Sequence, residues 1–318
     1  MTAKLELSQQ QLSKKSALLG TASLFVALVP ISLAPVLTKL CEREIGANAV
    51  AFHRAWIATI IFGLWCGLEA VSSQKSNNQP IEQKPLTKGE LALLFCMGTA
   101  GTTYFLLWAW SLTQTSVANV ALLSNLNSLF VGLVGYLVFG RRFDHRFVVG
   151  MVMAVGGAIA FELNKVQLAT DQILGDGLAL LTAIFMATYL MLVERLRTRF
   201  STATIMLWRC GVTAMFLLPV LPVVENRLLP YTSMGWFFII FQALFCQVFG
   251  QGLLAYSLSK LSSGVVAVTL LFEPVLASLF AWLIFNEEVS FYDWITFIVI
   301  LLGIYLAQSS QSADKATN

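Results

Sequence analysis

Long apolar stretches recur along the whole sequence, and they constrain the fold more than any other feature does. Crossing the hydrocarbon core of a bilayer takes about 20 predominantly apolar residues in a helix. Ten stretches reach or approach that length, and polar segments separate them. They are Ala17–Leu40, Asn48–Val71, Gly89–Leu112, Val117–Phe139, Phe147–Phe161, Ile173–Val193, Ala203–Val224, Met234–Ser257, Gly264–Phe285 and Trp294–Ala307. We therefore predict an all-α integral membrane protein with ten transmembrane helices, of which the fifth and the tenth are short.

The composition agrees with a hydrocarbon environment. Hydrophobic residues make up 57% of the 318 positions and charged residues 12%, with a mean hydropathy of +0.76. Soluble domains carry about a quarter charged residues. The net charge of +3 is small and the basic residues are dispersed, so we expect the lipid bilayer, and no nucleic acid, among the partners. The 5 cysteines form no CxxC pair, and we expect neither a metal site nor a cofactor.

Basic residues are distributed unevenly over the predicted loops. With ten helices and the N-terminus inside, fourteen Lys and Arg residues lie on the cytoplasmic side and four on the other side. Cytoplasmic loops of membrane proteins carry such an excess. We therefore expect both termini in the cytoplasm and the protein in the plasma (inner) membrane of a bacterium. The first apolar stretch is too long for the core of a cleavable signal peptide.

The second half of the sequence repeats the first. At an offset of 146 residues, segment 109–144 aligns without gaps on segment 255–290, with nine identities over 36 positions. An offset of 155 aligns Arg54 with Arg209 upstream. The two offsets differ by nine residues because the first copy has the longer linker, 72–88. A duplication explains the equal helix order and the matched arginines.

Two glycine pairs follow the same offsets. Gly157 aligns with Gly303 at 146 residues, and Gly20 aligns with Gly175 at 155 residues. Each copy has five helices, an odd number, so the second copy must enter the membrane upside down. Inverted repeats that move about a central site are a recurrent transporter plan. We predict two inverted five-helix repeats around a central cavity, and a small-molecule transporter.

The predicted repeats divide the chain as follows. Segment 1–16 is a cytoplasmic N-terminal tail, the first repeat covers 17–163, the second covers 173–307, and 308–318 is a C-terminal tail. The linker 72–88 inside the first repeat is polar and has no counterpart in the second. We expect this linker to be cytoplasmic and dispensable for folding.

Three segments of the sequence resemble a known family. The stretch AYSLSKLSSGVVAVTLLFEPVLASLFAWLIFNEEVS, residues 255–290, resembles the helix-three/four signature of the EamA family in the drug/metabolite transporter (DMT) superfamily: a short polar turn, an apolar helix with a Glu-Pro step and an Asn-Glu exit. HRAW from His53 and WRCG from Trp208 resemble the family's arginine in the second helix of each copy. The resemblance covers the chain from about Leu18 to Ala307.

The resemblance implies a ten-helix bundle with a central cavity and the efflux or exchange of metabolites. We accordingly predict a secondary transporter of amino-acid-like or other small organic solutes, working by alternating access, and no enzyme. The first copy departs from the family pattern, because Asn127–Ser128 stand where the second copy has Glu273–Pro274. The substrate site is therefore expected to be asymmetric.

Ionisable residues inside the predicted helices are the main site candidates. Placing such a side chain in hydrocarbon costs about 2.5–3.5 kcal/mol, so each should face a cavity or a partner. Arg209 and Glu273 lie at similar predicted depths, and we expect an ion pair between them with a structural or a coupling role. Arg54 has Asn127 in place of the carboxylate. We expect Arg54 to bind an anionic group of the substrate; the alternative is that it snorkels to the interface.

Glu273 has two further interpretations. It is a protonatable residue that couples transport to protons, or it belongs to a helix bend that Pro274 causes. Amide and aromatic side chains complete the candidates. Glutamines are costly to place in lipid and are the better cavity candidates, whereas aromatic residues at helical spacing more often face lipid or the core. The remaining substrate-binding candidates are Trp108, Asn125, Asn127, Gln247 and Gln251. Gln247 and Gln251 are four residues apart and share a helix face.

Two other classes of protein compete with a transporter. A membrane-embedded enzyme would need a clustered set of titratable residues, but the sequence has no DDxxD, HExxH or G-x-S-x-G motif. A non-transporting membrane scaffold has no sequence signature that would separate it from a transporter. We expect a transporter to have a central, polar-lined cavity open to one side, an enzyme to have clustered titratable residues near an interface, and a scaffold to have neither.

Overall fold

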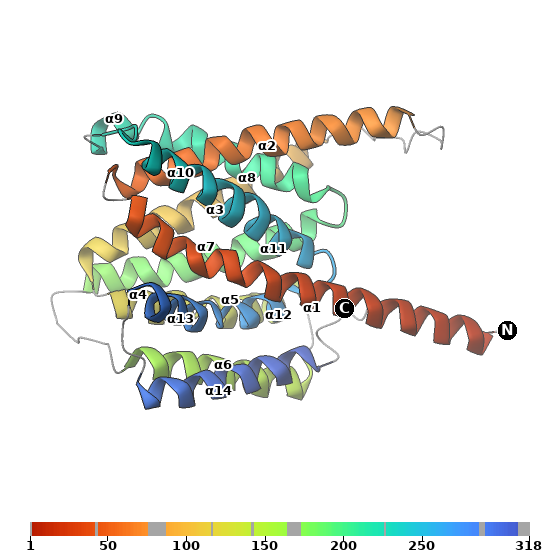
Figure 1. Cartoon of the computed structure of the whole chain (residues 1–318). Helices are drawn as coiled ribbons and strands as arrows, with labels where there is room; N and C mark the ends of the chain where they lie inside the picture. Colours follow the sequence, from red (N-terminus) through yellow and green to blue (C-terminus); the bar gives the residue numbers. More distant parts are fainter. Residues whose placement is uncertain are drawn as a thin grey trace.

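Apolar helices joined by short connections make up the part of the chain that the structure describes (Figure 1). The computed structural model describes residues 2–41, 44–75, 87–115, 117–140, 143–163, 173–225, 227–285 and 290–310. The helices in the first half are α1 Thr2–Cys41, α2 Ala47–Lys75, α3 Lys88–Gln114, α4 Val117–Ser124, α5 Asn127–Phe139 and α6 His145–Leu163. Those in the second half are α7 Ile173–Leu196, α8 Thr202–Leu217, α9 Leu221–Val224, α10 Ser233–Gln242, the π-helix η2 Ala243–Gly250, α11 Gln251–Ser257, α12 Ser263–Leu270, α13 Glu273–Phe285 and α14 Phe291–Gln308.

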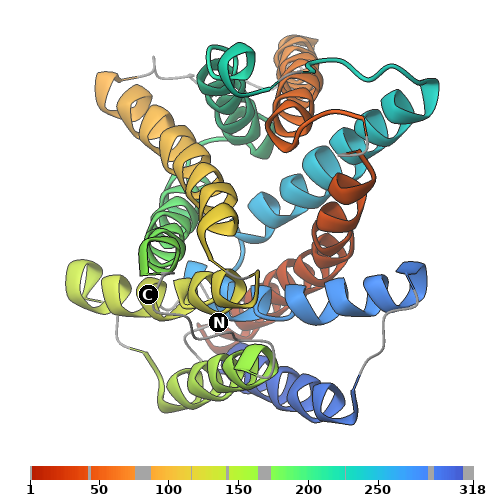
Figure 2. The same cartoon turned by 90° about the vertical axis from the view of Figure 1, so that its left-hand side faces the viewer.

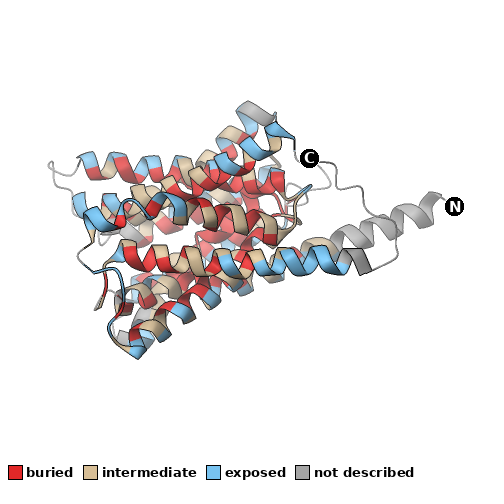
Figure 3. Ribbon diagram, turned by 90° about the horizontal axis from the view of Figure 1, so that it is seen from above, coloured by how far each residue is buried: buried red, intermediate tan, exposed pale blue. Residues whose placement is uncertain are grey.

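Eight helical segments among the described residues are long and apolar enough to cross a membrane. Two shorter apolar helices, His145–Phe161 and Thr202–Leu217, accompany them. Large apolar side chains face outward along these helices, among them Leu68 at 71% exposure and Tyr305 at 69%. Figure 3 shows the buried residues inside the bundle and the exposed ones around it. An apolar surface of this extent fits contact with lipid, and the chain is a multi-pass integral membrane protein.

The N-terminal segment differs from the expected tail. Helix α1 begins at Thr2 and runs without interruption into the first apolar stretch, although Pro30 and Pro35 lie inside it. Lys15 is exposed on this helix, and Leu18 and Leu19 follow at 69% and 52% exposure. Segment 2–16 is therefore an extension of the first helix rather than a separate element.

Two stretches that the sequence predicts as single helices are divided. Val117–Phe139 breaks into α4 and α5 at a turn formed by Asn125 and Leu126, and Gly264–Phe285 breaks into α12 and α13 at Leu271 and Phe272. The second turn lies 146 residues after the first. Pro274 then occupies the first turn of α13, where its missing N–H costs no helical hydrogen bond.

The eighth apolar stretch contains a π-helix, Ala243–Gly250, between α10 and α11. Aromatic rings line one side of this region at four-residue spacing: Phe237, Phe241, Phe245 and Phe249 stack with centroids 6.1, 5.3 and 6.0 Å apart. Phe237 and Phe249 are about half exposed, at 58% and 46%. π-helical segments are often found at functional sites.

The helices pack in pairs that combine the two halves of the chain. α2 packs against α8 and α6 against α14, while α3 packs against α7 and α8, and α1 packs against η2, α11 and α13. Seen from one end, α2 and α8 lie on one side of the bundle and α6 and α14 on the opposite side (Figure 2). Helix α1 begins and α14 ends toward the same end of the bundle (Figure 1).

Glycines at matching positions make matching close contacts. A Cβ on Gly157 would lie 2.8 Å from the Ile300 side chain, and a Cβ on Gly303 would collide with the backbone of Ala154. Both residues of the second contact lie 146 positions from their counterparts in the first. The packing of α6 on α14 is therefore reciprocal.

A second reciprocal pair joins α1 and α7 to the connections that follow α11 and α3. A Cβ on Gly20 would meet Lys260 and Leu261, and a Cβ on Gly175 would meet Gln114 and Thr115. The glycines are offset by 155 residues and their contacts by 146, as in the sequence alignment. These small residues allow the helix backbones to approach closely.

The linker predicted at 72–88 is shorter than expected. Helix α2 extends to Lys75, and Thr87 caps α3 through a capping box with Glu90, in which the Thr87 backbone N–H donates to the carboxylate at 2.9 Å. Residues 76–86 lie outside the described residues.

Candidate functional site

Arg54 and Gln247 come together in the interior, although 193 residues separate them. The Arg54 guanidinium on α2 donates through Nη2 to the Gln247 side-chain oxygen at 2.9 Å. Gln247 belongs to the π-helix η2 and is 7% exposed. The two residues come from different halves of the chain, so this hydrogen bond joins the halves.

Arg209 lies next to this pair on α8. Gln247 donates through Nε2 to the Cys210 sulfur at 3.4 Å, which places the residue after Arg209 against the same amide. Arg54 and Arg209 are close enough to repel each other electrostatically, and Tyr104 and Cys210 lie within electrostatic range of both. We call Arg54, Arg209, Tyr104, Tyr189 and Gln247 the arginine cluster.

Two tyrosines hold Arg209 in place. Its Nη2 donates to the Tyr104 hydroxyl oxygen at 2.8 Å, and its Cζ lies 5.0 Å from the centroid of the Tyr189 ring. The two phenol rings are 5.7 Å apart. A guanidinium over an aromatic face is attracted to the negative side of the ring quadrupole. Gly101 makes room for this arrangement, because a Cβ there would lie 3.2 Å from Tyr189 and 3.4 Å from Arg209 Nε.

Several nitrogen donors of the two arginines are buried without a hydrogen-bond partner. They are Arg54 Nε, Arg209 Nε and Arg209 Nη1. Among the described residues, no carboxylate forms an ion pair with either guanidinium. A buried donor without an acceptor costs about 1–3 kcal/mol, and more when it is charged. The cluster therefore has unmet capacity for acceptor atoms and for negative charge.

The expected Arg209–Glu273 ion pair is wrong for the described residues. Arg209 contacts the two tyrosines, and Glu273 forms no ion pair or hydrogen bond with a described residue. The reason lies in the helix packing: Glu273 begins α13, which packs against α1, whereas α8 packs against α2, α3 and α11. Similar depth in the bundle is not sufficient for contact.

The other predicted site residues lie at separate positions. Asn125 is in the turn between α4 and α5, and Asn127 begins α5; the Asn125 Nδ2 and Asn127 Oδ1 atoms are buried without partners. Gln251 begins α11 with its Oε1 atom buried and unpartnered. Trp108 packs on Phe105 with ring centroids 6.2 Å apart. Among the described residues, no hydrogen bond or ring contact joins Asn125, Asn127, Gln251 or Trp108 to the arginine cluster.

Sequence reasoning missed two members of the cluster, Tyr104 and Tyr189. Aromatic residues are common on lipid-facing and core surfaces, so neither tyrosine stands out in an apolar helix. Tyr189 is 1% exposed, and nothing in its sequence context points to a cation. The repeat gives one usable signal. An offset of 146 aligns Gly101 with Gln247, and each of these positions faces the arginine of the other half: Gln247 faces Arg54 and Gly101 faces Arg209.

At one end of the bundle, polar contacts join the loops of the two halves. Glu225 accepts from the Asn48 backbone N–H at 3.1 Å and from the Asn48 side chain at 2.9 Å. Glu44 accepts from the backbone and the hydroxyl of Thr232. His53 is buried, and its Nε2 lies 2.7 Å from the Leu228 carbonyl oxygen. These contacts join residues 44, 48 and 53 of the first half to residues 225, 228 and 232 of the second.

The apolar helical bundle defines a multi-pass membrane protein, and a polar, positively charged cluster lies between its halves. The chain belongs to the EamA-like transporter family of the drug/metabolite transporter superfamily, whose family model matches residues 18–162 and 173–308. It is a membrane transporter of small molecules. The family expectation from the sequence is thereby confirmed.

Similar proteins agree with this class. An uncharacterized transporter of Archaeoglobus fulgidus is 23% identical over 286 residues, which cover 87% of this chain and 92% of the relative. A pseudopaline exporter of Pseudomonas aeruginosa is 21% identical over 270 residues, covering 84% and 88%. A solved crystal structure shares the fold with a TM-score of 0.71 at 18% identity, over 92% of this chain and 97% of that one.

Proposed function

We propose that the protein is a secondary transporter that moves small organic metabolites by alternating access, as an exporter or exchanger, and that Arg54 binds an anionic group of the substrate. The arginine cluster carries this proposal. It lies where α2 and α3 of the first half meet α7, α8 and η2 of the second, so movement of one half against the other would change access to it.

The proposed architecture is ten membrane-crossing helices in two inverted five-helix repeats. The reciprocal glycine contacts and the matched breaks at 125–126 and 271–272 support it. The contacts of Asn48 with Glu225, of Thr232 with Glu44 and of His53 with Leu228 support a form in which this end of the bundle is closed. The relative that is named an exporter supports efflux.

Exchange in liposomes tests the function. Purified protein, reconstituted into liposomes preloaded with members of a metabolite panel, should accumulate at least one labelled solute by counterflow, whereas empty liposomes should not. Absence of exchange for every solute, with correctly inserted protein, would contradict a transporter. Glu273 remains a candidate for proton coupling: the Glu273→Gln variant should keep counterflow and lose any acceleration by a pH gradient.

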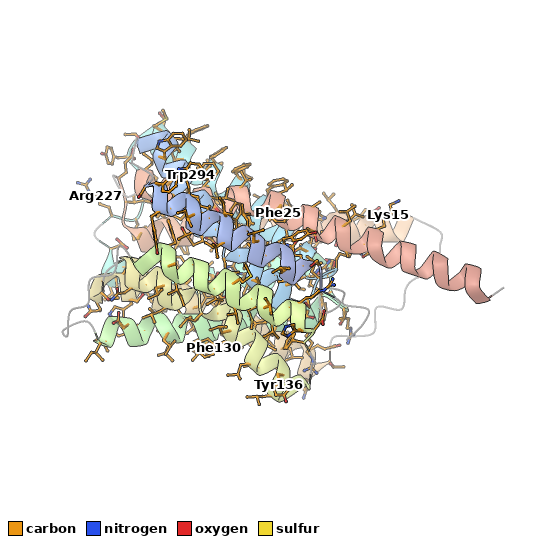
Figure 4. All side chains as sticks on the ribbon, turned by 90° about the horizontal axis from the view of Figure 1, so that it is seen from below. Lys15, Phe25, Phe130, Tyr136, Arg227 and Trp294 are labelled. Atoms are coloured by element: carbon orange, nitrogen blue, oxygen red, sulfur yellow. The ribbon has the colours of Figure 1, made fainter. Side chains whose placement is uncertain are left out.

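The proposed orientation places both termini in the cytoplasm. Lys15 lies toward one end of the bundle and Arg227 at the other (Figure 4), so the more basic end would be cytoplasmic. A single cysteine introduced by Ser76→Cys into a variant without native cysteines should therefore be inaccessible to an impermeant thiol reagent in intact cells and react after permeabilisation. Labelling in intact cells at the permeabilised rate would reverse the orientation.

A further inference from the structure

The arginine cluster has one guanidinium from each half of the protein. Arg54 lies on α2 and Arg209 on α8, at sequence positions that correspond in the two halves. Gln247 accepts from Arg54 and donates to Cys210, the residue that follows Arg209 in α8. Two positive charges thus share one interior site and repel each other.

The acceptors that the protein supplies are few for these charges. Each guanidinium carries five N–H donors, yet the structure gives Arg54 the Gln247 oxygen and gives Arg209 the Tyr104 hydroxyl. Arg209 is more than nine-tenths buried, with 8% exposure, and both its Nε and its Nη1 are unpartnered. Because each arginine has an unpartnered donor, a ligand that satisfies both must present acceptor atoms to each guanidinium.

Four carboxylates among the described residues have partners outside the arginine cluster. Glu225 binds Asn48 and Glu44 binds Thr232 at the closed end, Asp176 accepts from Thr115 at 2.8 Å, and Glu194 accepts from the Ser263 backbone at 3.1 Å. Glu273 makes no ion pair among the described residues. The excess of two positive charges at the cluster is therefore matched by no described side chain.

We propose that the site binds organic dianions whose two acid groups are separated by a short carbon chain, with one acid group on Arg54 and the other on Arg209. This inference rests on the proposed function and narrows its substrate class. Carboxylates fit the planar donor fork of a guanidinium in a bidentate manner. Two arginines on different helices favour two separate acid groups over a single doubly charged group, and the apolar rings of Tyr104 and Tyr189 offer contact for the intervening carbons.

Such a ligand contacts both halves at once. Each of its acid groups neutralises one guanidinium and supplies acceptors to donors that the protein leaves unpartnered. A ligand with a single acid group would leave one arginine uncompensated. Selectivity for two acid groups over one is the property that this geometry predicts.

A matched set of ligands tests this selectivity by binding rather than by transport. The probes are linear dicarboxylates of four to seven carbons, with the monoamide and the diamide of each, which keep the size and remove one or two charges. Titration calorimetry and thermal-shift measurements on the purified full-length protein should show that at least one dicarboxylate binds. Its monoamide should bind at least about tenfold more weakly, equivalent to about 1.4 kcal/mol, and its diamide should not bind.

Variants assign the two acid groups. The Arg54→Gln variant should bind the dicarboxylate as weakly as it binds the monoamide. The control variant Arg227→Gln, at an exposed position, should keep the wild-type ratio of the two dissociation constants. Arg209→Gln should act as Arg54→Gln does. Arg209→Gln leaves Tyr104 and Tyr189 without their cation and is prone to misfold, so Arg209→Lys serves as a second variant. It keeps the charge but loses the planar donor fork, and it should reduce the ratio of the monoamide's dissociation constant to that of the dicarboxylate.

The outcomes separate this inference from the proposed function. Three results would overturn the dianion site: equal binding of dicarboxylate and monoamide at every chain length, no binding of any dicarboxylate, or an unchanged ratio of their dissociation constants in Arg54→Gln and Arg209→Lys. Exchange of other solutes in liposomes would still support the proposed transport. Binding in the predicted order without exchange in liposomes would uphold the dianion site and overturn the proposed transport.

Discussion

Replacing Arg54 with alanine should abolish exchange of the substrate in liposomes while the protein remains folded. Arg54 contributes a positive charge at the meeting point of the two halves and shares Gln247 with the cluster. A hydrogen bond to a charged group is worth about 1.5–3 kcal/mol, so binding should weaken by roughly tenfold to more than a hundredfold. Removing the guanidinium also relieves its repulsion with Arg209, so we expect no loss of thermal stability.

Two further variants make the Arg54 result specific. Arg54→Lys keeps the charge but loses the planar fork, and it should transport at an intermediate rate. Arg227→Ala is the matched control, because Arg227 is exposed and lies at the end of the bundle; it should transport at the wild-type rate. All variants must reach the membrane in equal amounts and elute as a single species. Wild-type exchange by Arg54→Ala would make Arg54 a structural residue.

The sequence predicts the helices of this fold well because their cause is local. Each predicted stretch contains a helix, since apolar length reports directly on the environment that the helix must cross. The breaks at Asn125–Leu126 and Leu271–Phe272 are a different matter, because hydropathy continues unchanged across them. The π-helix at 243–250 likewise has no hydropathy signature, since one extra residue per turn changes neither length nor composition.

Three of the five members of the arginine cluster could be predicted from the sequence, but their contacts could not. Arg54, Arg209 and Gln247 stand out individually because each is costly in hydrocarbon. Their partners depend on which helices touch: depth alone suggested Glu273 for Arg209, but α13 packs on α1 and Tyr104 takes that place. Because Arg209 does not pair with Glu273, Asn127 at the corresponding position does not explain why Arg54 lacks a carboxylate partner among the described residues. The unpartnered donors now support the same role for Arg54.

Replacing Gly150 with alanine should destabilise the protein strongly, whereas the same change at Gly156, on the same helix, should not. Gly150 lies where α6 touches α14: a Cβ there would lie 2.6 Å from the Gly303 carbonyl oxygen and 3.0 Å from the Ala307 Cα. These are backbone atoms, which cannot rotate aside as a side chain could. A Cβ on Gly156 meets nothing within 4 Å. The two glycines therefore separate close packing from helix propensity.

The expected sizes follow from these contacts. Overpacking typically costs about 1–3 kcal/mol, which corresponds to a fall in the melting temperature of about 1.5–4.5 °C for a protein of this size. Gly156→Ala should leave the melting temperature unchanged or raise it slightly. Alanine lowers the conformational entropy of the unfolded chain, which raises the free energy of unfolding by about 0.4–1 kcal/mol. Melting of the purified variants, followed by intrinsic fluorescence, measures both.

The same experiment tests the α6–α14 contact from the side of α14. Gly303 on α14 meets the Ala154 backbone as Gly150 meets that of Ala307, so Gly303→Ala should lower the melting temperature about as much as Gly150→Ala does. Both losses arise in one interface, so the double variant should lose less than the sum of the two. Equal stability of Gly150→Ala and Gly156→Ala would contradict the backbone contact between α6 and α14 at Gly150.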